Sequence, residues 1–432
     1  MLAINGGTPV VACDDIAPWP EVTDADRAAV LRAVDRSTPW RWPLPDVQEL
    51  EANWAQHTGM RFAVAANSGT GALHMAVAAA DIGPGDEVLV PADTFLASAT
   101  CVLQANAVPV FVDVDPVTYT IDPAQVRRHI TERTRAIVAV DLHGLPADYD
   151  PLRAVAREHD LVLIEDGAQA HGARYRGTPV GGLGDMAGCS LNGSKTLSAL
   201  SEAGLFTTND QRWHENALRV LMFGDEIRGM TREYNARIMG WNYRMHSLGA
   251  AFARSQLERL PTMSAARGAN GDRLAKALLD VPGVRPPAVP EDRTHVYFFF
   301  PMLVEPEATG LDINVDAFRT AVKVALRAEG VPVDEWQRVP VPGQTLFQEL
   351  RGYGRGCPWL CGPARPGRAY RVEDYPVALD ICRRRLVLGS STSAFGPGND
   401  GVVDRFGEAF HKVLVEHRGE LPVLAARLTE AV

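Results

Sequence analysis

The sequence lacks an apolar segment of the length that a transmembrane helix needs. A membrane span takes about 20 apolar residues, and the longest strongly apolar run in the second half, Val296–Val304, is roughly half that length. The start, Met1-Leu-Ala-Ile-Asn-Gly-Gly, has no cationic stretch and no long apolar one, so it does not resemble a signal peptide. We therefore expect a protein that does not contact membranes.

Cysteine and positive charge are also scarce. Six cysteines are scattered over 432 residues, a usage typical of free thiols in a reducing compartment, and we predict a cytoplasmic protein. The formal net charge of −10 argues against a nucleic-acid binder but not against a local basic pocket for a small anion. Cys357 and Cys361 lack the second Cys or His pair that a zinc site needs, so we expect no bound metal.

Internal repeats and low-complexity tails are absent, and the composition is that of a globular protein, with 46% hydrophobic and 22% charged residues. The chain is too long for one ordinary core. We predict an N-terminal segment with a large cofactor-binding domain over residues 1–265 and a smaller domain over 266–432. The proline-rich segment Val284–Pro290 is the expected joint.

Strand-like and helix-like segments alternate from about residue 45 to 260. Short runs that are apolar on both faces suit a parallel sheet covered by helices, and the alternation indicates a three-layer α/β domain. The predicted strands are Phe62–Ala66, Glu87–Val90, Val108–Val112, Ala136–Val140 and Leu161–Ile164, and the predicted helices are Asp46–His57, Gly71–Asp81 and Pro151–His159.

The C-terminal part has fewer signals. We expect a strand over Val296–Val304, a helix over Val315–Glu329 and a last helix near Gly401–His417. The stretch from Trp336 to about Tyr375 is irregular, and a loop of that length in a compact domain is often functional.

Two segments carry residues suited to binding a phosphorylated ring. Ser68-Gly69-Thr70 stands where a strand runs into a helix, and N–H groups at such a helix start bind phosphate, although an ordinary N-cap is the alternative. Asp166 follows the apolar run Leu161–Ile164, at the strand end where open parallel sheets bind ligands. An ionised carboxylate there can keep a buried pyridine nitrogen protonated, or it can cap the next helix.

Lys195 lies in a turn of small residues, Asn192-Gly-Ser-Lys, one apolar segment further along. A lone lysine is usually exposed, but a desolvated lysine has a lowered pKa and acts as a nucleophile or base. It could form an imine with a cofactor and then move a proton. A fourth segment, Gly240-Trp-Asn242-Tyr-Arg244-Met, is typical of a loop that enters a helix over Ala250–Leu260.

Together with Pro91-Ala-Asp-Thr-Phe95, these segments resemble the DegT/DnrJ/EryC1/StrS aminotransferases, a branch of the fold-type-I pyridoxal-phosphate enzymes. The resemblance covers most of residues 5–265 and depends on the order of five motifs along the chain. It implies a three-layer α/β/α large domain with a mainly parallel sheet, a smaller C-terminal α/β domain, and an aminotransferase that uses pyridoxal 5'-phosphate.

The resemblance implies a role for each matching residue. Lys195 corresponds to the lysine that carries the cofactor as a Schiff base, and Asp166 to the partner of the pyridinium nitrogen; these two are the predicted catalytic residues. The other implied cofactor contacts are Ser68, Gly69, Thr70 and Ser190 at the phosphate, Phe95 on the ring, Gln169 at the phenolic oxygen, and Asn242 at the phosphate of the partner subunit. The last contact implies a homodimer with shared active sites.

Departures from the family pattern bear on the substrate. Relatives that act on nucleotide sugars often have a histidine two or three residues before the lysine, where this chain has Asn192-Gly-Ser. Ser201-Glu-Ala203-Gly replaces the usual Gly-Glu-Gly-Gly, so a positive φ is not expected at Ala203. Ile4-Asn-Gly-Gly-Thr-Pro and Asn-Gly-Ser-Lys favour the branch that makes aminocyclitols, aminohydroxybenzoate and related antibiotic precursors.

We predict a keto-cyclitol or keto-sugar as the acceptor and glutamine or glutamate as the donor. For each candidate substrate contact, a solvated or packed role is as plausible; the candidates are Arg244, His295, Arg338, Arg351 and Arg355. The run Arg383-Arg-Arg385 is favoured as the solvated face of a turn over a site for the donor carboxylate.

Other functions stay open. They are amination of a nucleotide-linked keto-sugar, dehydration of a keto-sugar, an aminohydroxybenzoate-type synthase, and an inactive paralogue. Lys195 is present and no cysteine set has iron–sulfur spacing, which disfavours the dehydratase. Ser-Gly-Thr-Gly-Ala-Leu lacks the Gly-x-Gly-x-x-Gly spacing of a nicotinamide-binding turn.

Overall fold

A seven-stranded sheet forms the centre of the first half of the chain, in a computed structural model that describes residues 1–16, 18–36, 44–228, 231–360, 369–389 and 394–430. The strands lie in the order β1-β9-β8-β5-β4-β2-β3. Only β9 runs against its neighbours, so the predicted mainly parallel sheet is confirmed. The bounds are β1 Phe62–Ala66, β2 Glu87–Pro91, β3 Val108–Val112, β4 Thr134–Val140, β5 Val162–Asp166, β8 Met186–Ser190 and β9 Gly204–Thr208.

Helices cover both faces of this sheet. One face packs against α3 (Gly69–Ala79), α4 (Ala97–Gln104) and α7 (Gln211–Leu221). The other packs against α5 (Pro123–His129) and α6 (Tyr149–Glu158), and against α2 (Pro45–Thr58) and the start of α8 (Ser247–Leu278). The α/β/α layering inferred from the alternating segments is therefore present.

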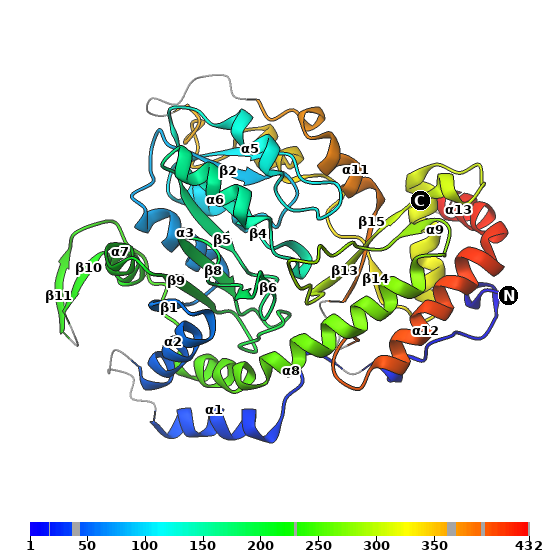
Figure 1. Ribbon diagram of the computed structural model, residues 1–432, viewed down its shortest axis with the longest axis horizontal. Helices are drawn as coiled ribbons and strands as arrows, with labels where there is room; N and C mark the ends of the chain where they lie inside the picture. The colour runs from blue at the N-terminus through cyan, green and yellow to red at the C-terminus, as the bar shows by residue number, and fades with distance from the viewer. Residues whose placement is uncertain (17, 37–43, 229–230, 361–368, 390–393, 431–432) are drawn as a thin grey trace.

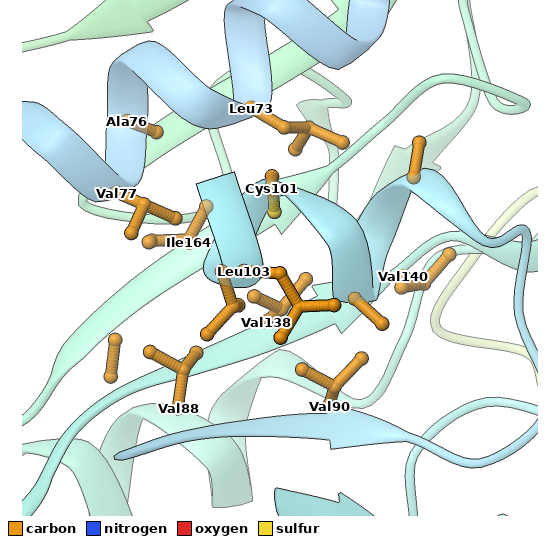
Figure 2. Close-up of a cluster of buried hydrophobic side chains, with 14 of the residues drawn as sticks. Leu73, Ala76, Val77, Val88, Val90, Cys101, Leu103, Val138, Val140 and Ile164 are labelled. Carbon is orange, nitrogen blue, oxygen red and sulfur yellow. The ribbon is translucent and has the colours of Figure 1, made fainter. Parts of the chain in front are cut away.

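Alternation along the buried strands explains why both faces need cover. Val88 and Val90 of β2 join the cluster beneath α3 and α4, while Leu89 between them joins the cluster beneath α5 and α6. Figure 2 shows the first cluster, in which side chains of α3 and α4 meet those of β2, β4 and β5. Successive strand residues point to opposite faces, so an unbroken apolar run buries both.

A smaller antiparallel sheet lies in the C-terminal part, in the order β12-β13-β15-β14. Its strands are β12 Val284–Arg285, β13 Phe299–Val304, β14 Val333–Asp334 and β15 Arg385–Gly389, and the helices of this part are α9 Val315–Ala328, α10 Thr345–Gln348, α11 Pro376–Arg384, α12 Asp400–His411 and α13 Leu421–Glu430. A π-helical turn, Lys412–Glu416, follows α12. The prediction that a helix near Gly401–His417 is the last is wrong, because α13 follows it.

The long helix α8 connects the two parts of the molecule (Figure 1). It begins near the predicted start but continues for 32 residues, with Pro261 inside it, so it crosses residue 265 without a break. Helix α1 (Asp24–Arg36) packs along it. The division into residues 1–265 and 266–432 stays a prediction.

The N-terminal residues pack against the C-terminal part. Leu2 and Val11 belong to the same buried cluster as α9, α12 and α13. The Val11 N–H donates to the Glu329 carbonyl at 3.0 Å, and the Asn5 amide donates to the Glu420 carboxylate at 2.5 Å. Both chain ends therefore lie on the same side of the molecule (Figure 1).

Two short hairpins complete the fold. The pair β6 (Arg174–Tyr175) and β7 (Thr178–Pro179) lies close to the sheet, and the pair β10 (Asp225–Arg228) and β11 (Thr231–Ala236) projects from the body beside α7 (Figure 1). Within the described ranges, no helix is both long and apolar enough to cross a membrane.

The free-thiol prediction holds for some cysteines only. Cys101, Cys189 and Cys382 are free and buried. Cys357 is disulfide-bonded, so the prediction is wrong there, and Cys361 lies outside the described residues. Among the described residues, no group of three or more His, Cys, Asp or Glu side chains is arranged to hold a metal ion.

Candidate active site

A cavity of about 370 Å³ opens at the carboxyl edge of the large sheet. Val140, Asp166 and Ser190, which line it, are the last residues of the parallel strands β4, β5 and β8. Open parallel sheets bind ligands at this edge. Eight of the nine predicted site residues line the cavity: Ser68, Gly69, Thr70, Phe95, Asp166, Gln169, Ser190 and Lys195.

Asp166 presents a buried carboxylate to the cavity. Its Oδ2 accepts a hydrogen bond from the Ser98 hydroxyl at 2.6 Å, and its Oδ1 accepts one from the Ala168 N–H at 3.1 Å. Burial raises the pKa of Asp166, whereas these two bonds and the charge of Lys195 lower it. No helix follows Asp166, so the helix-cap alternative does not apply. The sequence did not predict the contact between Ser98, one turn beyond Phe95, and Asp166.

Lys195 lines the same cavity as this carboxylate, in the turn after β8. Burial lowers the pKa of the Lys195 amine to about 8, and the charges of Asp166 and Glu202 oppose that shift. The amine therefore loses its proton more readily than an ordinary lysine, as a nucleophile or base requires. The Lys195 N–H donates to the Asn192 carbonyl at 2.8 Å, which fixes the turn that carries the side chain.

The N-terminus of α3 forms one end of the cavity. Ser68 is the N-cap, and its hydroxyl accepts from the Gly71 N–H at 3.0 Å. A Cβ at Gly69 would lie 2.5 Å from the Ser190 Cβ, so only glycine allows α3 and β8 to approach this closely. The remaining first-turn N–H groups and the Thr70 and Ser190 hydroxyls suit a phosphate.

A backbone contact orients Gln169. The His143 N–H donates to the Gln169 Oε1 at 2.7 Å, which leaves the Gln169 Nε2 as the donor for the cavity. His143 has φ of 61°, in the left-handed region, and is buried. Such a conformation costs about 1–3 kcal/mol and persists where surrounding contacts fix it. The sequence carried no signal for this contact.

Three polar residues that were not predicted as site residues, although their segments depart from the family pattern, line the cavity together with Lys195. The Asn192 amide donates to the Glu202 carboxylate at 2.6 Å, and the Asn192 Oδ1 accepts from the Ser194 hydroxyl at 2.8 Å. We call Asn192, Ser194 and Glu202 the polar rim. Ala203, next to it, has no positive φ, as expected.

Asn242 does not line the cavity of its own chain. It is exposed, and its backbone carbonyl accepts from the Asn67 side chain at 3.2 Å. The Asn67 N–H donates to the Tyr243 carbonyl at 2.6 Å, so the Asn242 segment lies beside the end of β1. The role of Asn242 as a cofactor contact of a partner subunit stays a prediction.

The five candidate substrate contacts lie off the cavity wall. His295 is buried and its ring stacks on Tyr297 with a centroid distance of 3.9 Å. Arg338 and Arg351 are exposed and pair with Glu335 and Glu349. Arg244 and Arg355 are also absent from the cavity lining.

Arg385 corrects the prediction of a solvated arginine run. Both Arg385 Nη atoms donate to Asp93, at 2.5 and 2.9 Å, and neither side chain is exposed. Arg383 is exposed and Arg384 half-buried, so the prediction is wrong at Arg385. The pair joins β15 to the loop that carries Phe95, and the Asp93 carboxylate already binds both Nη atoms of Arg385.

Two neighbours of the site have structural roles. Glu165 is fully buried, and its carboxylate accepts hydrogen bonds from the N–H groups of Gly181, Leu183 and Gly184. His171 is also buried, next to the Thr196 hydroxyl, and burial lowers its pKa to about 3. Both side chains are therefore packed, and neither lines the cavity.

These residues fit pyridoxal 5'-phosphate. Three features meet in the cavity. They are the N-terminus of α3, where only glycine fits at position 69, the buried carboxylate of Asp166, and the Lys195 amine, whose pKa burial lowers to about 8. An anion, a basic ring nitrogen and an aldehyde are the groups that such a site would hold. Fold and site together define a fold-type-I pyridoxal-phosphate-dependent enzyme.

Comparison with known proteins gives the family. The profile of the DegT/DnrJ/EryC1/StrS aminotransferase family matches residues 21–358. The chain belongs to this family, whose members are pyridoxal-phosphate-dependent aminotransferases.

Individual relatives support the assignment. The L-glutamine:2-deoxy-scyllo-inosose aminotransferase of Streptoalloteichus tenebrarius is 37% identical and covers 97% of this chain and 99% of its own. GDP-perosamine synthase of Caulobacter vibrioides is 42% identical over 57% of this chain and 66% of its own. The crystal structure of 3-amino-5-hydroxybenzoic acid synthase has a TM-score of 0.80 at 28% identity, over 92% of this chain and 99% of its own.

Proposed function

We propose that this aminotransferase moves an amino group from glutamine or glutamate to a cyclic ketone, a keto-cyclitol of the scyllo-inosose type or a keto-sugar. The reaction would serve the biosynthesis of an aminocyclitol or amino-sugar antibiotic in the cytoplasm. The donor becomes a 2-oxo acid and the ketone becomes an amine, so the oxidation of one balances the reduction of the other.

The observation that carries amino transfer is the presence of Lys195 and Asp166 on the wall of one cavity. A base with a pKa near the working pH transfers protons efficiently in both directions, and the Lys195 pKa of about 8 meets that condition. Asp166 supplies a fixed negative charge on the wall of the same cavity.

Each wall of the cavity has a part in holding the cofactor. Ser68, Gly69, Thr70 and Ser190 would bind the phosphate, and Phe95 would cover one face of the ring. Asp166 would bind the ring nitrogen, and the free Gln169 Nε2 would donate to the phenolic oxygen.

Pyridoxal phosphate, when bound, supplies an electron sink for the carbanion that forms at the donor Cα. Lys195 would remove the proton from the donor Cα in the first half-reaction. In the second half-reaction it would deliver a proton to the carbon of the acceptor that becomes the amine carbon. The bond from the Lys195 N–H to the Asn192 carbonyl holds the turn still while the side chain moves. Asp166, kept in place by Ser98 and Ala168, would hold a proton on the ring nitrogen.

The polar rim supports a polyhydroxylated ring as the acceptor. Glu202 and Asn192 offer a carboxylate and an amide to hydroxyl groups, and Ser194 offers a further hydroxyl. Among the described residues that line the cavity, Lys195 is the only cation, so the chain itself offers no counter-charge for a diphosphate there. The nearly full-length similarity to L-glutamine:2-deoxy-scyllo-inosose aminotransferase agrees with this choice.

Amination of a nucleotide-linked keto-sugar is the second candidate. It is favoured by the 42% identity to GDP-perosamine synthase, which extends over 57% of the chain. A diphosphate would then have to lie outside the cavity described above, on residues of the surface or of a partner subunit.

We also propose a homodimer with shared active sites. Large apolar side chains are exposed on the projecting β10–β11 hairpin and on both sides of it in the chain; they are Tyr234, at 79% exposed, Met239, at 77%, Ile238 and Phe223. Asn242 follows this surface in the chain; it is exposed and is not among the residues that line its own cavity. A second copy of the chain would cover this surface and receive Asn242 at its phosphate end.

The test is an amination screen read by mass. Purified enzyme with glutamine or glutamate is offered 2-deoxy-scyllo-inosose, nucleotide-linked keto-sugars and free keto-sugars, and Lys195→Ala is the matched control. We expect an amino product from the keto-cyclitol with wild type and none with the variant. Product from nucleotide-linked sugars alone would replace the first candidate by the second, and product from Lys195→Ala at the wild-type rate would end both.

A further inference from the structure

Two aromatic side chains from distant parts of the chain contact Lys195. The Lys195 Nζ lies 4.4 Å from the centroid of the Phe298 ring, which belongs to the C-terminal part of the chain. At the other end of the residue, the Trp19 indole N–H donates to the Lys195 carbonyl at 3.1 Å. Lys195 is thus held at its amine and at its backbone.

Arg267 of α8 connects the two aromatic residues. Its Nε donates to the Val296 carbonyl at 3.0 Å, and its Nη2 donates to the Tyr297 and Phe298 carbonyls at 2.5 and 3.5 Å. Its guanidinium carbon lies 5.8 Å from the Trp19 ring centroid. Arg267 is buried, so these contacts replace the water that its charge would otherwise bind.

The segment before β13 that carries Phe298 is closely packed from the large-sheet side. The Val296 N–H donates to the Gly144 carbonyl at 3.0 Å. A Cβ at Gly144 would lie 3.0 Å from the Phe298 backbone N, and Gly144 has φ of 107°. The Phe298 ring, which is 3% exposed, therefore has little freedom to move.

We propose that Phe298 and Trp19, both positioned by Arg267, form an aromatic clamp that holds Lys195 in place for proton transfer whenever its amine is free of the cofactor. The inference rests on the role proposed above for Lys195. A base that acts twice in each cycle must return to one position, and a displacement of about 1 Å costs about 100-fold in rate. The clamp supplies that position.

The face of a phenyl ring attracts an ammonium group. Three titratable groups also act on Lys195: Asp166 and Glu202 favour its charged form, and His171 is uncharged at neutral pH because burial lowers its pKa to about 3. Burial of Lys195 favours the neutral form. Removing the ring face while keeping the site closed should therefore lower the pKa of Lys195.

The experiment compares Phe298→Leu with Phe298→Tyr and with the matched control Phe299→Leu. Phe299 is the next ring along the chain; it packs on Phe298, His143 and Trp336, whereas the Lys195 amine lies over the Phe298 ring. The full-length enzyme is loaded with pyridoxamine phosphate, which leaves Lys195 free. Its pKa is then measured by competitive acetylation at several pH values, read by mass on the Lys195 peptide.

Phe298→Leu should lower the pKa of Lys195 by about one unit, the shift that a desolvated cation–π contact corresponds to. Phe298→Tyr should keep the wild-type value because it keeps the ring, and Phe299→Leu should also keep it. In turnover, Phe298→Leu should lower kcat about tenfold or more with little change in the donor KM. An unchanged pKa in Phe298→Leu, or an equal shift in Phe299→Leu, would overturn the clamp.

Trp19 is tested by Trp19→Phe, which keeps a ring beside Arg267 but removes the hydrogen bond to Lys195. We expect a lower kcat at an unchanged donor KM, and an unchanged kcat would remove Trp19 from the clamp. Borohydride reduction of the wild-type holoenzyme separates the two proposals. A tag on Lys195 with no effect of Phe298→Leu refutes the clamp alone, whereas a tag elsewhere refutes the role of Lys195 itself.

Discussion

Replacing Arg385 by methionine tests whether this arginine is a structural residue. In the wild-type protein, both Nη atoms of Arg385 bind the two carboxylate oxygens of Asp93, and both side chains are 0% exposed. Methionine fills a similar volume but provides no charge and no donor. The Asp93 carboxylate would then stay buried without its counter-ion.

Removal of one member of a buried pair costs about 3–5 kcal/mol, because the remaining charge has lost both water and partner. We expect Arg385→Met to lower the free energy of unfolding by that amount. The matched control is Arg351→Met: the Arg351–Glu349 pair is 72% and 47% exposed, and such pairs contribute about 0–1 kcal/mol. The double variant Asp93→Leu with Arg385→Met should recover most of the loss, since no charge is left unpaired.

Urea denaturation followed by tryptophan fluorescence measures these free energies. A loss in Arg385→Met that does not exceed the loss in Arg351→Met would refute the reasoning. A stable Arg385→Met protein with a strongly raised KM for the amino donor would instead make Arg385 a donor-binding residue.

Three further predictions concern the cavity. Asp166→Asn should slow the half-reaction with glutamine by about 100-fold or more, which is the range for the loss of one preorganised charge. Stopped-flow absorbance measures this rate, and a rate equal to that of the wild type would contradict the role of Asp166. Gly69→Ala places a Cβ 2.5 Å from the Ser190 Cβ, and such overpacking costs about 1–3 kcal/mol. It should therefore weaken cofactor binding about 5- to 150-fold, as measured by fluorescence titration. Unchanged binding would refute the role of Gly69 in the close approach of α3 to β8. Asn242→Ala should weaken cofactor binding in the dimer, and an unchanged affinity would remove the cross-subunit contact.

Local patterns in the sequence predicted much of the large domain. The strands β1 and β3 match their predicted ranges residue for residue, because each is a short apolar run with polar residues close to both ends. The length of α8 could not be predicted in the same way. Pro261 normally ends a helix, but here tertiary packing extends the helix to Leu278.

The site residues also fall into those that local sequence patterns could predict and those that depend on tertiary packing. Gly69, Asp166, Ser190 and Lys195 lie in motifs next to strand ends, and the parallel topology alone brings strand ends together. Phe298 reaches Lys195 from the other part of the molecule, and no spacing in the sequence marks that contact.

Arg385 shows how a local pattern can mislead. A run of three arginines is typical of a solvated turn, yet α11 ends at Arg384 and β15 begins at Arg385. The first strand residue then points inward to Asp93, a partner that is remote in the sequence. Only the folded arrangement makes burial of that charge possible.

The account depends most directly on the covalent attachment of pyridoxal phosphate to Lys195. Purified holoenzyme is reduced with borohydride, digested, and mapped by mass spectrometry. We predict a yellow protein that loses its colour on reduction and carries the phosphopyridoxyl group on the Lys195 peptide alone. The Lys195→Ala variant should bind the cofactor but form no covalent bond to it. A colourless protein, or a label on another lysine, would contradict the account.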